Sequence, residues 1–447
     1  MKRNHGEEQP HIKLTKSGLF KLRVPFIHWR FAFPESIQAL ILLTVTLAAI
    51  PILENTLGIS FEVAILMVTI NSMLYLLHQG LGDPINPGWI TAAIPITVAH
   101  LSNYTIGIER FHALIALQIV LGILFITLGI TGLAKKIVAK VPIAIRGGIL
   151  LGAAISAIFG AANPAGHMSG HYISFIFGSI VSILVLYSAR FIRVKDKNVA
   201  FKTVAKMGLS AGMISALIVG VMVGEMPMPV IEWGLIPLPF VELISNYTIF
   251  ALGLPNFYFF VQAVPMAFLV YLISFGDFVL SESVVKEADI IRNDEIVEYN
   301  ANRSNIICGI RNIGLGIFSP YPPLAGPMWA GASISNFERY KQGREAVDSI
   351  HDGVHSFQWT ILIAGLLMPV VSLLRPALPI GMALTFIIQG FACGYVAISM
   401  LKTRAQQGVA TIIGVLIFAQ GAAVALIAGI ALYLLLGNDE PKDGGED

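Results

Sequence analysis

Charged residues are scarce in this chain. Only 13% of its 447 residues are Asp, Glu, Lys or Arg, whereas 55% are hydrophobic and the mean hydropathy is +0.76. A soluble protein of this length needs far more polar surface, so the composition indicates a polytopic membrane protein. The formal net charge of +2 comes from nearly balanced totals and gives no sign of a nucleic-acid partner.

Cysteine and enzyme signatures are also nearly absent. Cys308 and Cys393 both lie in apolar segments, which excludes a disulfide framework and a CxxC metal motif. The sequence contains no HExxH, no Gly-x-Ser-x-Gly and no paired aspartates within an apolar segment. We therefore expect a protein that is not an enzyme and carries no metal or organic cofactor.

Long apolar segments dominate instead, and they predict an all-α polytopic membrane fold. Gln420-Gly421 divides the last of them, a run of roughly 30 residues that is longer than one span requires, into two short helices. The total is then fourteen segments, or seven plus seven. They lie near residues 36–57, 60–78, 84–98, 112–134, 141–161, 172–190, 204–225, 256–285, 304–319, 320–334, 357–374, 380–401 and, in two parts, 407–436.

The third and tenth segments are interrupted in the same way. Residues 83–97 read DPINPGWITAAIPIT and residues 320–331 read PYPPLAGPMWAG, so both place prolines first, then glycine beside proline, then tryptophan, then small residues. Proline removes a backbone donor and disfavours helix before it, which predicts a short extended stretch followed by a half-helix. Two such segments in corresponding halves indicate the binding site of a transporter.

An odd number of segments per half implies that the second half is inverted in the membrane. The two broken segments then enter from opposite faces, and their helical N-termini face one cavity near the midplane. Free N–H groups at two helix starts suit a negative or carbonyl-rich group. We predict a substrate site formed by Asn86, Pro87, Gly88, Trp89, Ala325, Gly326, Met328 and Trp329. Core packing or interfacial anchoring is an equally good interpretation of each tryptophan alone.

The distribution of basic residues predicts the orientation. The first 35 residues are basic and lack the apolar core of a signal peptide, which predicts a cytoplasmic tail. Alternate loops then place every Lys and Arg except Arg110 and Arg375 on the cytoplasmic side, Arg303 and Arg311 included. Residues 227–255 become an extracellular hairpin or loop, and residues 438–447 a cytoplasmic acidic tail, so that both termini are cytoplasmic.

The eighth segment supplies the strongest ionisable candidate. Helical spacing places Ser274, Asp277 and Ser281 on one face, with Glu282 beside them. An acid within a spanning helix is expensive and indicates a substrate or ion path, so we predict that Ser274 and Asp277 contact substrate and that Asp277, Ser281 and Glu282 bind Na⁺ or H⁺. In the alternative interpretation the span ends near residue 276 and both acids lie at the surface.

Some polar residues stand alone in other apolar segments. Hydrogen bonds between helices explain them better than ligand contact does. They are Asn71, Gln118, Gln389 and Gln420.

With these motifs in place, the chain resembles the nucleobase/ascorbate and uracil–xanthine permeases (nucleobase-cation-symporter-2 type), whose fold is shared with sulfate-permease-type anion transporters. Ser274-Phe275-Gly276-Asp277 is similar to the Glu-Ser-x-Gly-Asp signature of those permeases, with Asp277 as its Asp. The leading Glu is matched by Ile273, and the acid or amide expected after the tenth-segment strand is matched by Met328 or Trp329.

The resemblance implies a core moving against a gate, often within a homodimer. The core corresponds to residues 36–134 and 256–374, and the gate to residues 135–226 and 375–437. The expected function is Na⁺- or H⁺-coupled symport of a small polar solute, either nucleobase-like or a small organic anion, by elevator-type alternating access across a cell membrane. The alternative is an inorganic or carboxylate anion exchanger or channel of the sulfate-permease kind.

Overall fold

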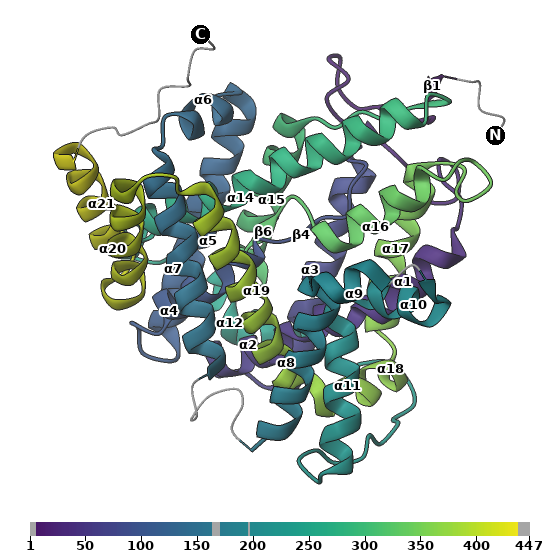
Figure 1. Ribbon diagram of the computed structural model, residues 1–447, viewed down its shortest axis with the longest axis horizontal. Coiled ribbons are helices and arrows are strands. Elements are labelled where there is room, and N and C mark those ends of the chain that lie inside the picture. The colour runs from purple at the N-terminus through teal and green to yellow at the C-terminus, as the bar shows by residue number, and fades with distance from the viewer. Residues whose placement is uncertain (1–5, 163–169, 195–196, 437–447) are drawn as a thin grey trace.

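The computed structural model describes residues 6–162, 170–194 and 197–436, and the predicted acidic tail lies outside them. The described chain is mostly helical (Figure 1). Its α-helices are α1 Phe33–Leu47, α2 Ala49–Leu57, α3 Phe61–Gly80, α4 Ile94–Leu101, α5 Ile108–Thr131, α6 Ala134–Ala139, α7 Ile143–Ala162, α8 Tyr172–Tyr187, α9 Ala189–Val194, α10 Val199–Met207, α11 Leu209–Met222, α12 Phe240–Tyr247, α13 Ile249–Leu252, α14 Phe257–Ile291, α15 Ala301–Phe318, α16 Ala330–Tyr340, α17 Ile350–Gly365, α18 Met368–Leu374, α19 Leu378–Met400, α20 Arg404–Gln420 and α21 Ala422–Leu436.

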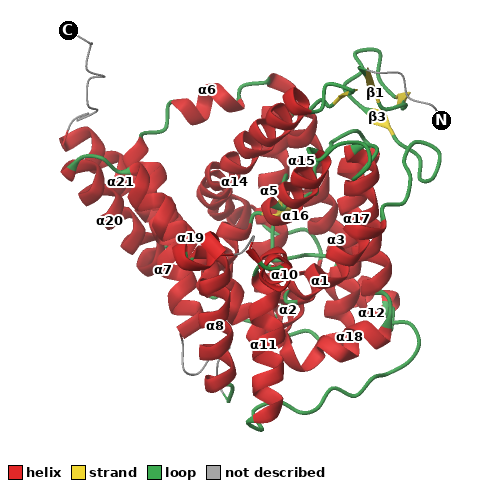
Figure 2. Ribbon diagram, turned by 45° about the vertical axis from the view of Figure 1, so that its right-hand side comes forward, coloured by secondary structure: helices red, strands yellow, loops and turns green. Residues whose placement is uncertain are grey.

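Six short strands accompany the helices (Figure 2). They are β1 Glu7–Glu8, β2 Ile12–Lys13, β3 Lys21–Leu22, β4 Gly88–Trp89, β5 Glu295–Ile296 and β6 Ala325–Gly326, and a 3₁₀ turn, η1 Thr91–Ala93, joins β4 to α4. β4 pairs antiparallel with β6, in the register Gly88 to Gly326 and Trp89 to Ala325. Strands far apart in the sequence therefore meet among the helices.

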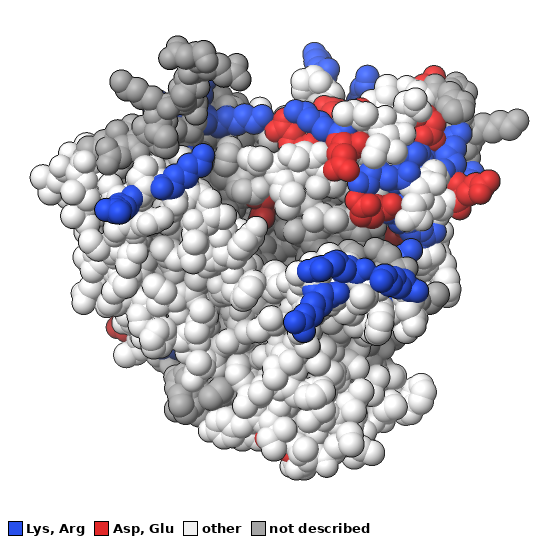
Figure 3. Space-filling model, in the orientation of Figure 1, with Lys and Arg blue, Asp and Glu red and all other residues white. Residues whose placement is uncertain are grey.

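The molecule is an integral membrane protein. Six helical stretches within the described residues are long and apolar enough to cross a bilayer: Phe33–Leu57, Phe61–Gly80, Ile108–Thr131, Ile143–Ala162, Phe257–Ile291 and Met368–Met400. Most charged side chains in Figure 3 lie toward one end of the molecule, above a large uncharged surface. That surface includes many exposed Ile, Leu, Val and Phe side chains. Soluble proteins rarely expose so many apolar side chains together.

The helices pack in two groups that the sequence order alone does not show. α5 packs against α14 and α15, and α17 packs against α1 and α3. In the other group α7 packs against α19 and α20, and α8 against α11. Contacts of α4 and α14 with α7, and of α1 with α11 and α19, join the groups.

Glycine permits the close contact of α5 with α15. A β-carbon added at Gly309 of α15 would lie 2.6 Å from the carbonyl oxygen of Gly122 in α5, and one added at Gly122 would lie 2.7 Å from that of Gly309. Small residues let backbones approach in this way, and close van der Waals packing then replaces the hydrophobic drive that lipid cannot supply.

The N-terminal residues, predicted to be a cytoplasmic tail, form strands and pack against the helices. β1 pairs with β5 in parallel, and β2 pairs with β3 as a hairpin. The backbone N–H of Lys21 donates to the carbonyl of Leu81, and Trp29 is only 2% exposed. This segment therefore packs over the connection between α3 and β4, because backbone pairing with β5 and burial of Trp29 hold it there.

Other predicted boundaries differ more modestly from the structure. The region 227–255 contains α12 and α13, and its Ile236 N–H donates to the carbonyl of Leu366 at the end of α17. α14 continues without a break through Pro265 to Ile291, past the predicted limit of 285. Gly421 separates α20 from α21 at a φ of 86°, which is the division predicted at Gln420-Gly421.

Substitution of Gly309 tests the close contact of α5 with α15. We expect Gly309→Ala to lower the thermal unfolding midpoint in detergent, because the added carbon overlaps the Gly122 carbonyl and overpacking of this kind costs about 1–3 kcal/mol. Gly314→Ala in the same helix is the matched control, since nothing lies within 4 Å of its added carbon. Equal midpoints for the two variants would contradict the described packing.

Candidate functional site

The crossing of β4 and β6 is the centre of the candidate site. Two-residue strands leave most of the surrounding backbone unpaired, and in a membrane interior each unpaired polar group is costly. The Ile90 N–H donates to the Leu324 carbonyl at 2.9 Å, and the Trp329 N–H donates to the Asn86 carbonyl at 2.7 Å. These bonds extend the pairing on both sides of the strands.

Side chains of α5 and α15 complete the backbone hydrogen bonding. The Asn312 amide donates to the Ala325 carbonyl at 2.9 Å and accepts from the Ala325 N–H at 3.0 Å. Gln118 of α5 makes the same pair of bonds with Tyr321, both at 3.2 Å. The two amides therefore act as substitutes for a neighbouring strand.

Arg311 of α15 provides the positive charge at the crossing. Its Nη1 donates to the Gly326 carbonyl at 2.8 Å and its Nη2 to the Gly88 carbonyl at 3.3 Å, so one guanidinium contacts both strands. The group lies 4.7 Å above the ring of Tyr75 and is completely buried. Within the described ranges no carboxylate pairs with Arg311, and its Nε has no hydrogen-bond partner.

Glycine is required where the strands meet. A β-carbon at Gly88 would lie 3.0 Å from the Met328 carbonyl oxygen and from the Trp329 Cα, and one at Gly326 would lie 3.0 Å from the Ile90 nitrogen. Any side chain would push the strands apart. Each interrupted stretch has a glycine beside a proline in the sequence. The glycine is explained by the close approach of the two strand backbones.

The remaining predicted residues of the two stretches are mostly occupied by protein contacts. The Asn86 amide donates to the Val354 carbonyl and accepts from Asn336 at 2.7 Å. The rings of Trp89 and Tyr321 lie 6.2 Å apart, and Trp329 meets Phe357 edge-on at 5.6 Å. Pro87 and Met328 are buried, as is Ala325 in β6. Trp329, only partly buried, directly precedes the start of α16.

The start of α16 leaves donors available. Trp329 is its N-cap residue and makes no side-chain capping bond. The first N–H groups of any helix have no partner within that helix, and they carry the positive end of its dipole. η1 begins at Thr91, one residue after β4 ends, and also lacks a side-chain cap. The N–H groups of Ala93 and of Ile94, the first residue of α4, already donate within this turn, whereas those of Thr91 and Ala92 have no partner among the described residues. Two helix starts with free donors therefore adjoin the strand crossing.

The predicted acids of α14 differ in their surroundings. Asp277 is partly exposed, and its carboxylate has no hydrogen bond or ion pair within the part of the chain that the structure describes. It lies within electrostatic range of Cys308 in α15 and of Cys393 in α19. Because α14 also contacts η1 and α16, Asp277 belongs to a helix that borders the strand crossing.

The side chains around Asp277 are already engaged. The Ser274 hydroxyl donates to the Tyr271 carbonyl, and the Ser281 hydroxyl donates to the carbonyl of Asp277. Glu282 forms ion pairs with Lys135 at 3.0 Å and Lys286 at 2.7 Å. Glu282 therefore has two basic partners, whereas the Asp277 carboxylate has none among the described residues.

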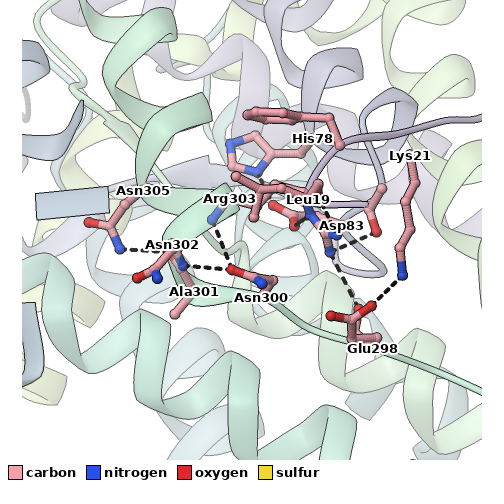
Figure 4. Close-up of polar contacts among 12 residues, drawn as sticks. Leu19, Lys21, His78, Asp83, Glu298, Asn300, Ala301, Asn302, Arg303 and Asn305 are labelled. Carbon is pink, nitrogen blue, oxygen red and sulfur yellow. Dashed lines mark hydrogen bonds and ion pairs between the residues drawn. The ribbon is translucent and has the colours of Figure 1, made fainter. Parts of the chain in front are cut away.

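A buried ion pair anchors the first stretch at its beginning (Figure 4). The Arg303 Nε donates to Asp83 at 2.7 Å, and the other carboxylate oxygen of Asp83 lies 2.8 Å from the Nδ1 of His78. Arg303 also donates to the carbonyls of Gly82 and Leu19. This network joins α15, the end of α3 and the N-terminal segment around the residue that precedes Pro84.

Sequence reasoning missed the importance of four residues in this site. Arg303 and Arg311 were used only in the count of cytoplasmic basic residues, which did not indicate that both are fully buried. Gln118 was explained by bonds between helices, whereas it satisfies the backbone of Tyr321. Asn312 directly follows Arg311 in a mostly apolar part of the segment, and this adjacent polar pair was the available signal.

Comparison with known proteins gives information about the fold. Neither protein-family models nor curated proteins match the chain. Among solved structures, the transmembrane domain of the cyanobacterium bicarbonate transporter BicA aligns over 92% of this chain and 100% of its own, at 12% identity and a TM-score of 0.51. The chain shares this fold.

Two structures of a second transporter also have a fold similar to that of this chain. SLC26A9 aligns over 91% of this chain at 12% identity and a TM-score of 0.54. The murine Slc26a9 anion transporter in its inward-facing state aligns over 93% at 11% identity and a TM-score of 0.52. The alignments span 65% and 69% of those two chains. The resemblance to nucleobase permeases in particular stays a prediction.

The buried pair of Asp83 and Arg303 yields a stability prediction. Asp83→Asn leaves a buried guanidinium without its counter-charge, and removal of one partner of such a pair costs about 3–5 kcal/mol. We expect a large fall in the thermal unfolding midpoint in detergent. Glu282→Gln is the control, because it breaks exposed pairs worth about 0–1 kcal/mol each. Comparable midpoints in the two variants would exclude Asp83 as an anchor.

Proposed function

We propose that this protein is a secondary transporter of a small inorganic or carboxylate anion. The observation that carries the proposal is Arg311, a fully buried cation at the crossing of β4 and β6 for which the described residues offer no acidic partner. A buried charge is tolerated only when other charges or hydrogen bonds offset its desolvation. Two backbone carbonyls offset part of that penalty, and a bound anion would offset more.

The helix starts supply the direct contacts for this anion. The N–H groups at the start of α16, and those of Thr91 and Ala92 in η1, have no partner among the described residues and can bind a ligand. The positive ends of both dipoles favour negative charge. Arg311 lies behind the strands and strengthens the field without having to reach the ligand. The structures of similar fold are described as a bicarbonate transporter and an anion transporter, which supports this class of substrate.

Asp277 provides the coupling in this proposal. Its unpaired carboxylate and Arg311 carry opposite charge, so an anion bound at the crossing adds one uncompensated negative charge to the site. Na⁺ or H⁺ bound at Asp277 would restore neutrality, which couples anion uptake to a cation gradient. Ser281 contributes less to binding the cation, because its hydroxyl already donates to the backbone carbonyl of Asp277.

The elevator mechanism belongs to the same proposal. We take β4 with α4, and β6 with α16, as the third and tenth of fourteen segments in a seven-plus-seven inverted repeat. The core would comprise residues 36–134 and 256–374, and the gate residues 135–226 and 375–437. The two groups of packed helices support this division, since α5, α14, α15 and α17 fall in the core and α7, α8, α11, α19 and α20 in the gate. Cytoplasmic termini and a homodimer complete the proposal.

A nucleobase is the less favoured substrate. Ile273 replaces the acid that the permease signature provides, and the Asn86 amide is bonded to Val354 and Asn336. An uncoupled exchanger or channel is the second candidate, favoured by the complete burial of Arg311, because a permanent positive charge serves anion passage without any cation.

Anion uptake by purified protein in proteoliposomes tests the substrate class. We expect uptake of bicarbonate, sulfate or a small dicarboxylate and no uptake of uracil. Arg311→Gln keeps hydrogen-bond donors for the two carbonyls but removes the charge, and we expect a loss of about tenfold or more, equivalent to about 1.4 kcal/mol. Arg311→Lys should retain part of the uptake, because it keeps the charge but not the forked geometry.

Controls separate loss of binding from loss of folding. Lys402→Gln removes an exposed charge and should leave uptake unchanged. Each variant is accepted only if its thermal unfolding midpoint without anion is near that of the parent. The shift of that midpoint on anion addition should be lost in Arg311→Gln. Uracil uptake, or full anion uptake by Arg311→Gln, would refute the proposal.

Asp277→Asn tests coupling on its own. We expect the variant to bind anion, as judged by thermal shift, while its uptake no longer responds to an imposed Na⁺ or proton gradient. Glu282→Gln is the matched control on the same helix, and it should keep the response because its carboxylate serves Lys135 and Lys286. Gradient-driven uptake that survives Asp277→Asn would favour the uncoupled candidate.

A further inference from the structure

The connection between α8 and α11 carries an unusual concentration of positive charge. In the sequence, residues 188–208 contain six Lys or Arg residues and a single acid, Asp196. We name the described part of this stretch, residues 188–194 and 197–208, the basic connector. Arg190, Arg193, Lys197 and Lys202 are all exposed in the structure. None of these four forms an ion pair within the described ranges, although Arg193 donates to the Ala189 carbonyl of its own helix. The connector therefore presents unneutralised charge.

Apolar side chains are exposed beside these charges. Ile192 in α9 is 47% exposed and Phe201 in α10 is 44% exposed. The rings of Phe191 and Phe201 meet edge-on at 6.0 Å and join the two short helices. Apolar and basic side chains exposed together are typical of a helix that lies in a membrane interface.

The position of the connector agrees with that composition. α8 has 16 residues and α11 has 14, fewer than the roughly 20 that cross a hydrocarbon core. The connector joins the ends of these two short helices and can therefore lie within reach of the lipid headgroups. α10 packs against α1, α8 and α11. In Figures 1 and 3, α9 and α10 lie across the ends of α8 and α11, and basic side chains form a belt there, apart from the acidic groups of that face.

We propose that the basic connector binds the headgroups of anionic phospholipids. Clusters of Lys and Arg directly beside a spanning helix attract the negative surface of a leaflet, and the attraction declines over a Debye length. The exposed Ile192 and Phe201 side chains distinguish a lipid from a free anion such as phosphate, because they would enter the acyl boundary beside the headgroup. This site is separate from the strand crossing and does not depend on the transported solute.

Native mass spectrometry of the full-length protein from nanodiscs of mixed phosphatidylcholine and phosphatidylglycerol provides the test. We expect retained phosphatidylglycerol to exceed its share of the mixture. The variant R190Q/R193Q/K197Q/K202Q should lower that enrichment by about threefold or more, and K197Q/K202Q by an intermediate amount. Added salt should weaken the enrichment in the parent and have less effect in the fourfold variant.

K13Q/K16Q is the matched control for K197Q/K202Q. Lys13 and Lys16 are equally exposed, and neither forms an ion pair in the portion of the chain described. This control should retain the parental enrichment. Equal enrichment in the parent and the fourfold variant would overturn the proposal, as would an equal loss in K13Q/K16Q. Displacement of phosphatidylglycerol by inorganic phosphate at low concentration would also overturn it, in favour of a free-anion site.

Discussion

Backbone hydrogen bonding at the crossing of β4 and β6 is the constraint on which the rest of the core depends. Extended chain within a membrane protein must satisfy its polar groups internally, and two residues per strand are too few to do so. The missing partners are Gln118, Arg311 and Asn312, all placed on helices that pack tightly beside the strands. The close approach of α5 and α15 through Gly122 and Gly309 is therefore part of the same arrangement.

The way in which these backbone groups are satisfied determines the charge at the crossing. Asn312 and Gln118 satisfy backbone groups without net charge, whereas Arg311 satisfies two carbonyls and introduces a permanent cation. Arg303 is equally buried but is neutralised by Asp83, so it anchors the structure and leaves no field for a ligand. The difference between these two arginines is what turns a structural crossing into a candidate anion site, with the unpaired acid Asp277 on a helix that borders it.

Sequence patterns predicted the membrane class and the two interrupted stretches, because proline and glycine have strong local effects. The role of Asp277 stays a prediction. These patterns gave no sign that Arg303 and Arg311 are buried. A loop-by-loop charge count assigns such residues to a helix end, and only tertiary packing shows that they are buried. The N-terminal residues were missed for a similar reason, since the pairing of β1 with β5 joins positions nearly 300 residues apart and leaves no local signal.

The location of a bound anion tests this account most directly. Anomalous diffraction from crystals soaked in bromide or selenate would place the anion without any assumption about transport. The account predicts a peak beside the starts of η1 and α16, close to the crossing of β4 and β6, and loss of that peak in Arg311→Gln. A peak elsewhere in the membrane region, with none at the crossing, would contradict it.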